Sequence, residues 1–196
     1  MYLSENQGCA LIRTIYILLT NTGTYLSRFI HILTRAEYTH VSMSFEEDLQ
    51  PLYSFSRKYV YLPLPAGLHN EPLDMGFFKK HSKIPCAVYK LEVDEETYIK
   101  AKSELQRMLD NAKYYRFSIL GLAFCGCRIP VNRRRHYFCS EFVSHILNTS
   151  NALKLPHKPC LMRPNDYTKI ESLECVFKGR LNGLLYNINT NNKISA

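Results

Sequence analysis

Cys139 is a residue whose type and surroundings could support covalent chemistry. The apolar spacing over residues 138–147 predicts an amphipathic helix that begins next to this cysteine. Unpaired backbone N–H groups and the positive end of the helix dipole stabilise a thiolate at such a position. The same N–H groups could hold the oxyanion that forms when the thiolate attacks a carbonyl carbon. Cys139 is therefore a candidate nucleophile.

His40 is the candidate base for this thiol. It lies near the start of residues 38–45, where apolar and polar side chains alternate as they do in a half-buried strand. Such a strand would hold the imidazole rigidly, with one ring nitrogen free to take the thiol proton. His136 is the weaker alternative, because a residue just before a helix usually points away from its first turn. On residue types alone, a buried apolar cysteine and a core histidine are the commoner situation.

A single domain of mixed class must position these two residues. A chain of 196 residues is long enough for one well-packed core, and we expect one domain over residues 1–196. The expected core runs from about residue 12 to 181, with a frayed tail at about 187–196. The predicted fold class is α+β, an antiparallel sheet with helices packed against it. Strands are predicted at 12–20, 38–45, 52–55, 85–93 and 175–181, and helices at 26–34, 94–109, 138–147 and from 164.

The charge and the targeting features of the sequence give only a little information about the partners and the location of the protein. The formal net charge is +8, with one dense group at Arg133, Arg134 and Arg135. A solvated loop is the favoured interpretation of this group, and contact with an anionic surface is the alternative. Residues 117–124 are predicted as core. We expect a cytoplasmic location, because neither a signal peptide nor a membrane-spanning segment is visible. The seven cysteines, an odd number, are expected to be reduced and mostly buried.

Four segments together resemble a known family: residues 25–30, 38–42, 137–143 and 163–166. Their residues and their order along the chain are similar to those of the circularly permuted papain-like group. This group includes YiiX-type bacterial proteins and lecithin–retinol acyltransferase, and it is related to NlpC-type cell-wall peptidases. In that group the histidine strand precedes the cysteine helix, as His40 precedes Cys139 here. The resemblance implies a permuted papain-like fold and a bacterial-type thiol hydrolase that needs no metal or organic cofactor.

The resemblance also implies a third polar residue that orients the imidazole. Matching residues 52–55 to the family's second hairpin arm places Ser54 there, where the family more often has His or Glu. Glu46 and Glu47 are alternatives, but a hairpin turn usually carries solvated acids. The expected function is cleavage of an amide, ester or thioester through an acyl-enzyme, on a small-molecule, peptide or lipid-acyl substrate. The alternatives are a catalytically weak binding module, favoured by the neutral Ser54, and below it a basic nucleic-acid-binding domain; no nucleic-acid partner is expected.

Residues 59–80 separate the predicted hairpin from the next strand. They are rich in proline and glycine and show no clear period, so we predict a long loop with short extended pieces. A loop of this length commonly covers a functional site. We therefore expect it to border the cleft between Cys139 and His40.

Overall fold

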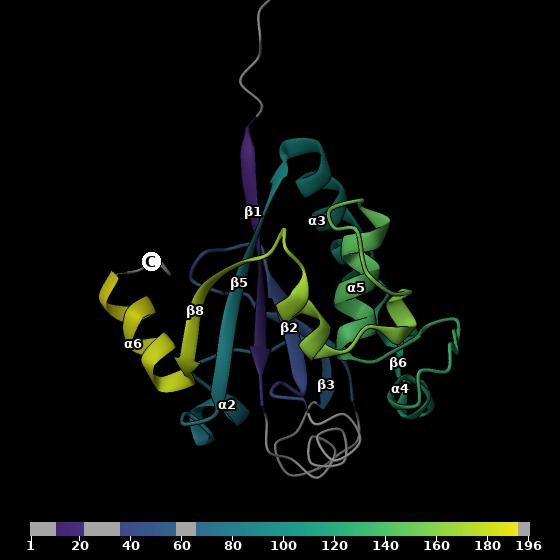
Figure 1. Cartoon of the computed structure of the whole chain (residues 1–196), viewed down its shortest axis with the longest axis horizontal. Coiled ribbons are helices and arrows are strands. Elements are labelled where there is room, and N and C mark those ends of the chain that lie inside the picture. Colours follow the sequence, from purple (N-terminus) through teal and green to yellow (C-terminus); the bar gives the residue numbers. More distant parts are fainter. Residues whose placement is uncertain (1–10, 22–35, 58–65, 192–196) are drawn as a thin grey trace, which may run out of the picture.

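The computed structural model describes residues 11–21, 36–57 and 66–191, and Figure 1 shows a sheet with helices against it. Six antiparallel strands form this sheet in the order β4-β3-β2-β1-β5-β8. They are β1 (Ile12–Thr20), β2 (His40–Ser44), β3 (Tyr53–Arg57), β4 (Ala66–Asn70), β5 (Pro85–Asp94) and β8 (Glu174–Arg180). Two short strands, β6 (Arg116–Phe117) and β7 (His136–Tyr137), pair in parallel beside it. The α+β class and the antiparallel sheet are confirmed.

Strand β1 lies in the middle of the sheet, between β2 and β5. Its apolar run is continuous because both of its faces are covered: Ile17, Leu18 and Leu19 are all fully buried. Ile17 and Leu19 belong to one apolar cluster and Leu18 to another. Since neighbouring strand residues point to opposite faces, the sheet has a separate core on each side. The predicted strand at 12–20 is confirmed at both ends.

Helices cover both of these cores. They are α2 (Gly76–Lys80), α3 (Glu95–Asp110), α4 (Ile119–Gly126), α5 (Cys139–Thr149) and α6 (Leu181–Asn191), with 3-10 turns η1 (Ala112–Tyr114), η2 (Pro159–Leu161) and η3 (Pro164–Lys169). Residues of α3 and α5 complete the larger cluster, and residues of α2 and α6 complete the smaller one. Figure 1 shows α3 and α5 on the opposite side of β1 from α6.

The two long helices begin where the sequence predicts. Asp94 precedes α3, and its carboxylate accepts a hydrogen bond of 2.8 Å from the backbone N–H of Thr97. Such a cap satisfies one of the N–H groups that a helix start leaves unpaired. The predicted apolar stripe of α3 faces the core, and α5 buries Phe142 and Val143 fully.

Several predicted segments differ from the structure. In the described part of residues 59–80, β4 is a short extended piece, as expected, and pairs with β3 along five residues, whereas the helix α2 was not expected. Helix α6 extends to Asn191 where a frayed tail was expected, since Leu184 and Ile188 bury apolar surface in the smaller cluster. The helix predicted at 26–34 and the family-like segment 25–30 lie outside the described residues.

Residues 117–124 are not core, contrary to the prediction. They form the end of β6 and most of α4, and Ile119 and Leu120 are about half exposed, at 52% and 54%. Only Gly121 and Cys125 of α4 are buried.

Within the described ranges, none of the helices combines the length and the apolarity that crossing a bilayer would need.

A candidate thiol active site

Cys139 is the first residue of α5 and is 6% exposed. The residue that caps this helix is Phe138, whose side chain has no oxygen to accept from the first-turn N–H groups. The first backbone bond of the helix runs from the N–H of Phe142 to the carbonyl of Phe138, at 2.9 Å. The N–H groups of the intervening residues therefore point out of the helix start next to the thiol.

His40 begins β2 and lies beside Cys139, where α5 packs against this strand. The His40 side chain is 11% exposed. Burial alone would lower the pKa of His40, but the charge of Glu71 and the interaction with the Cys139 thiol outweigh it, and the pKa is raised to about 10. The structure thus brings together the two residues that the sequence pairs, and it favours the imidazolium form of the ring.

Glu71 is the direct partner of His40, and sequence reasoning missed it. Its Oε2 lies 2.9 Å from Nε2 of the ring, in a nearly buried ion pair. The residue follows β4, and its backbone N–H donates to the carbonyl of Leu52 at 2.7 Å. The pairing of Tyr53 with Asn70 sets this position, so a residue 31 positions along the chain reaches the histidine.

Two serine hydroxyls hold the Glu71 carboxylate. Ser42 donates to Oε2 at 2.8 Å, and Ser56 donates to Oε1. Burial would raise the pKa of Glu71, but the His40 charge and hydrogen bonds to the carboxylate, that of Ser56 among them, lower it well below its usual range. The carboxylate stays ionised and has a fixed direction, as an orienting group in a catalytic triad must.

Ser54 does not take the role that the resemblance implies for it. It lies on β3, is fully buried, and its Oγ has no hydrogen-bond partner of ordinary geometry in the described part of the chain. It is near enough to Glu71 to contribute to the lowered pKa of that carboxyl. Glu71 contacts His40 in its place. Glu46 and Glu47 lie in the turn after β2, away from these contacts.

Glu141 is another buried carboxyl of this region, on the first turn of α5. Burial raises the pKa of Glu141 to about 8, although a hydrogen bond from the backbone N–H of Phe138 acts in the opposite direction. At neutral pH the group is therefore mostly a neutral acid.

Residues 162–167 hold the two elements that carry Cys139 and His40. The side chain of Asn165 accepts from the backbone N–H of Tyr38 at 3.2 Å, just before β2 begins. Tyr167 donates its hydroxyl to the carbonyl of Ser140, and Ser140 donates to the carbonyl of Met162 at 2.7 Å. These bonds tie the start of α5 and the approach to β2 to the same 3-10 turns.

The remaining candidates have ordinary surroundings. The Nδ1 of His136 donates to the carbonyl of Arg134 at 2.9 Å, so the ring is occupied in its own turn. The six cysteines that the structure describes are all free thiols. Cys86, Cys125, Cys139 and Cys160 are buried, whereas Cys127 and Cys175 are exposed. Among the described residues, no cluster of His, Cys, Asp and Glu is arranged to hold a metal ion.

The arrangement has the connections that a thiol nucleophile needs. Glu71 occupies Nε2 of His40, which leaves Nδ1 as the ring nitrogen available for the Cys139 proton. Transfer of that proton would give a thiolate beside an imidazolium, and the ionised Glu71 stabilises the imidazolium. The segment that supplies Glu71 belongs to residues 59–80, so its described part borders the site as expected.

The chain matches no protein-family model, no curated protein and no solved structure.

Proposed function

We propose that the protein is a cysteine hydrolase or acyltransferase that acts on an amide, ester or thioester, with Cys139 as nucleophile. The observation that supports this most strongly is the buried ion pair between His40 and Glu71 next to a thiol at a helix start. Burying two charges is costly unless they are well paired, and such pairs with perturbed pKa values are common at functional sites.

The proposed reaction uses three groups of this chain. Nδ1 of His40 takes the proton of the Cys139 thiol, and the sulfur attacks the carbonyl carbon of the substrate. First-turn N–H groups of α5 stabilise the tetrahedral oxyanion. His40 then returns the proton to the leaving group, and a thioester remains on Cys139. Water or another acceptor, deprotonated by His40, attacks this thioester and restores the free thiol.

Glu71 also bears on the alternative of a weak binding module. That alternative depended on a neutral third residue at Ser54, and a carboxylate stabilises an imidazolium better than a serine hydroxyl does. A permuted papain-like fold of the YiiX and lecithin–retinol acyltransferase kind is part of this proposal, supported by the order of the histidine strand and the cysteine helix. The proposal leaves the substrate within the class of amides, esters and thioesters.

The test is to trap the acyl-enzyme. The full chain is incubated briefly with p-nitrophenyl acetate at neutral pH, quenched in acid and mapped by peptide mass spectrometry. We expect one acetyl group on Cys139, and none at that position in H40A or C139S. The control is C127S, which removes an exposed thiol and should leave the labelling unchanged. Acetylation that favours Cys127 or Cys175, or that is equal in H40A, would overturn the proposal.

A further inference from the structure

Helix α4 presents apolar side chains to the solvent. Ile119, Leu120 and Phe124 are 52%, 54% and 37% exposed, and Ile129, just after the helix, is 48% exposed. The backbone N–H of Ile129 donates to the carbonyl of Phe124 at 2.9 Å, which holds these two residues at the same end of α4. Exposed apolar groups that cluster in this way commonly mark an interaction surface.

Basic residues lie near this apolar group in the sequence. Residues 111–140 contain six basic side chains and no aspartate or glutamate, and all six are exposed. They are Lys113, Arg116, Arg128, Arg133, Arg134 and Arg135. Arg128 contacts Asp166 at 3.6 Å, and within the described residues none of the other five has a carboxylate partner. We call these six cations and the four apolar residues the α4 surface.

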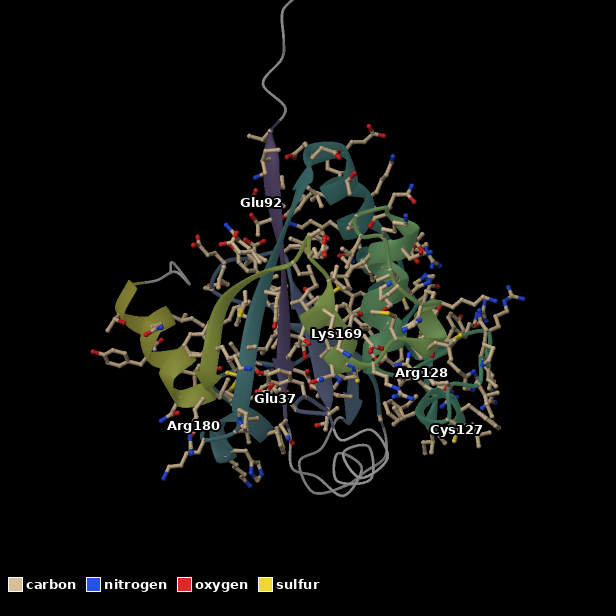
Figure 2. The ribbon with its side chains drawn as sticks, viewed as in Figure 1. Glu37, Glu92, Cys127, Arg128, Lys169 and Arg180 are labelled. Atoms are coloured by element: carbon tan, nitrogen blue, oxygen red, sulfur yellow. The ribbon has the colours of Figure 1, made fainter. Side chains whose placement is uncertain are left out.

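The fold gathers the α4 surface into one region of the molecule. Strands β6 and β7 pair, and the backbone N–H of Arg116 donates to the carbonyl of Arg135 at 2.9 Å. The guanidinium of Arg135 lies 5.5 Å from the centre of the Tyr114 ring. Figure 2 shows Cys127 and Arg128 at the edge of the molecule where α4 lies, on the opposite side from Arg180.

The combination of charge and apolar groups selects among the partners that could cover this surface. A second copy would bring six cations against six cations. A nucleic acid would use the cations but leave Ile119, Leu120 and Ile129 without a matching contact. A bilayer with anionic lipids matches both features, because headgroups attract the cations and the acyl boundary accepts apolar side chains. We propose that the α4 surface docks on an anionic lipid bilayer.

Docking at α4 would bring the bilayer close to the candidate site. Gly121 faces the buried side of the helix, where an added Cβ would lie 3.5 Å from the ring of Phe138. Phe138 immediately precedes Cys139, so α4 and the start of α5 are direct neighbours. The docking proposal does not rest on the proposed thiol chemistry, and the two are tested by separate measurements.

The test is flotation of the full chain with vesicles. Vesicles of phosphatidylcholine with phosphatidylglycerol are compared with pure phosphatidylcholine, at low and at high salt. We expect binding to the anionic vesicles only, reduced by high salt. The triple variant R133S/R134S/R135S should weaken this binding by at least about tenfold, since each cation near an anionic surface contributes appreciably to it. L120S/F124S should weaken it by a similar factor.

Matched controls keep the test specific. K79S/K83S/R180S removes the same number of exposed cations around α2 and the end of β8, and I99S removes an equally exposed isoleucine on α3. Both should bind as the unchanged protein does, and thermal unfolding checks that every variant folds. Equal binding to neutral vesicles, an equal loss in K79S/K83S/R180S, or no vesicle binding would overturn the proposal. So would a dimer in light scattering that L120S/F124S abolishes, because a second copy would then cover this surface.

Discussion

The charged side chains of the candidate site are buried and paired, whereas those of the α4 surface are exposed. In the site, Glu71 accepts from His40, Ser42 and Ser56, and both partners of the ion pair are nearly buried. On the α4 surface, exposed arginines stand beside exposed aliphatic side chains. The two regions are close, because α4 packs against Phe138 at the start of α5.

The difference concerns which group must satisfy each charge. A buried charge has to be matched by the protein itself, since water cannot reach it, and this fixes the direction of every side chain in the site. An exposed cation needs no partner within the chain and remains available for contact with another molecule or a membrane surface. Substitutions in the site should therefore change reactivity and stability, whereas substitutions on α4 should change neither.

The largest expected effect is that of H40A on the reactivity of Cys139. Without the imidazole, the thiol loses its base, and we expect the acylation rate with p-nitrophenyl acetate to fall roughly 100- to 10,000-fold. L120S, on the α4 surface, is the control and should react at the unchanged rate. The measurement is the extent of Cys139 acetylation in reactions of the two variants that are quenched at a series of times. A loss in L120S comparable to that in H40A would remove the contrast between the two regions.

Replacing Glu71 should cost both stability and reactivity. E71Q leaves the buried His40 without its counter-charge, so we expect a loss of about 3 to 5 kcal/mol in the free energy of unfolding. S54A, next to the same carboxylate, should have a much smaller effect because its hydroxyl makes no hydrogen bond of ordinary geometry in the described residues. Urea unfolding of both variants measures the difference.

The pH dependence of that loss follows from the two pKa shifts. The pKa of Glu71 is lowered, so its contribution is present above its ordinary pKa of 4.5 and is lost as the pH falls below that. The pKa of His40 is raised, so its contribution is complete below 6.5 and is lost as the pH rises toward about 10. The E71Q difference should therefore be largest between these two ordinary values. A difference that does not vary with pH would contradict the ion pair.

Glu141 should give a smaller effect with the opposite trend. Its pKa is raised from 4.5 to about 8, so the folded protein binds one more proton than the unfolded chain between these values. Stability should then fall as the pH rises from 4.5 to 8, by roughly 2 to 4 kcal/mol from this group. E141Q should remove this part of the slope, and unfolding at several pH values measures it. An unchanged slope in E141Q would show that the carboxyl is not held in its neutral form.

The smallest expected effect is that of L120S on stability. Leu120 is 54% exposed, and exposed substitutions away from special features usually change the free energy of unfolding by less than about 0.5 kcal/mol. Phe142 on α5 is fully buried, and F142A should cost about 3 to 5 kcal/mol. Thermal unfolding of both variants measures the contrast. A large loss in L120S would mean that α4 is part of the core after all.

Local patterns in the sequence were sufficient to predict the elements that carry Cys139 and His40. Each of these patterns lies within a single element. The apolar run of β1 and the spacing of Phe142 and Val143 indicate buried faces, and the cap at Asp94 indicates the start of α3. Cys139 and His40 could be paired because each lies at the start of such an element. The family resemblance added their order, and the structure places them side by side.

Glu71 and the exposure of α4 depend on contacts that no local pattern records. Glu71 reaches His40 only because β4 pairs with β3, and the β4 residues show no clear alternation. One signal was present: Glu71 and Asp74 are the only acids between Asp48 and Glu92. For α4, an apolar run indicates a helix or a strand but cannot show whether another element covers it.

The rate of Cys139 alkylation as a function of pH tests the central claim most directly. The protein, carrying C127S and C175S to remove the exposed thiols, is treated with iodoacetamide from about pH 5 to about pH 9, a range that brackets ordinary thiol behaviour. A thiol paired with His40 and Glu71 should react at mildly acidic pH, and H40A should move this reactivity to higher pH. If Cys139 instead reacts as an ordinary thiol with a pKa near ~8.5, and H40A leaves that profile unchanged, the account of this site is wrong.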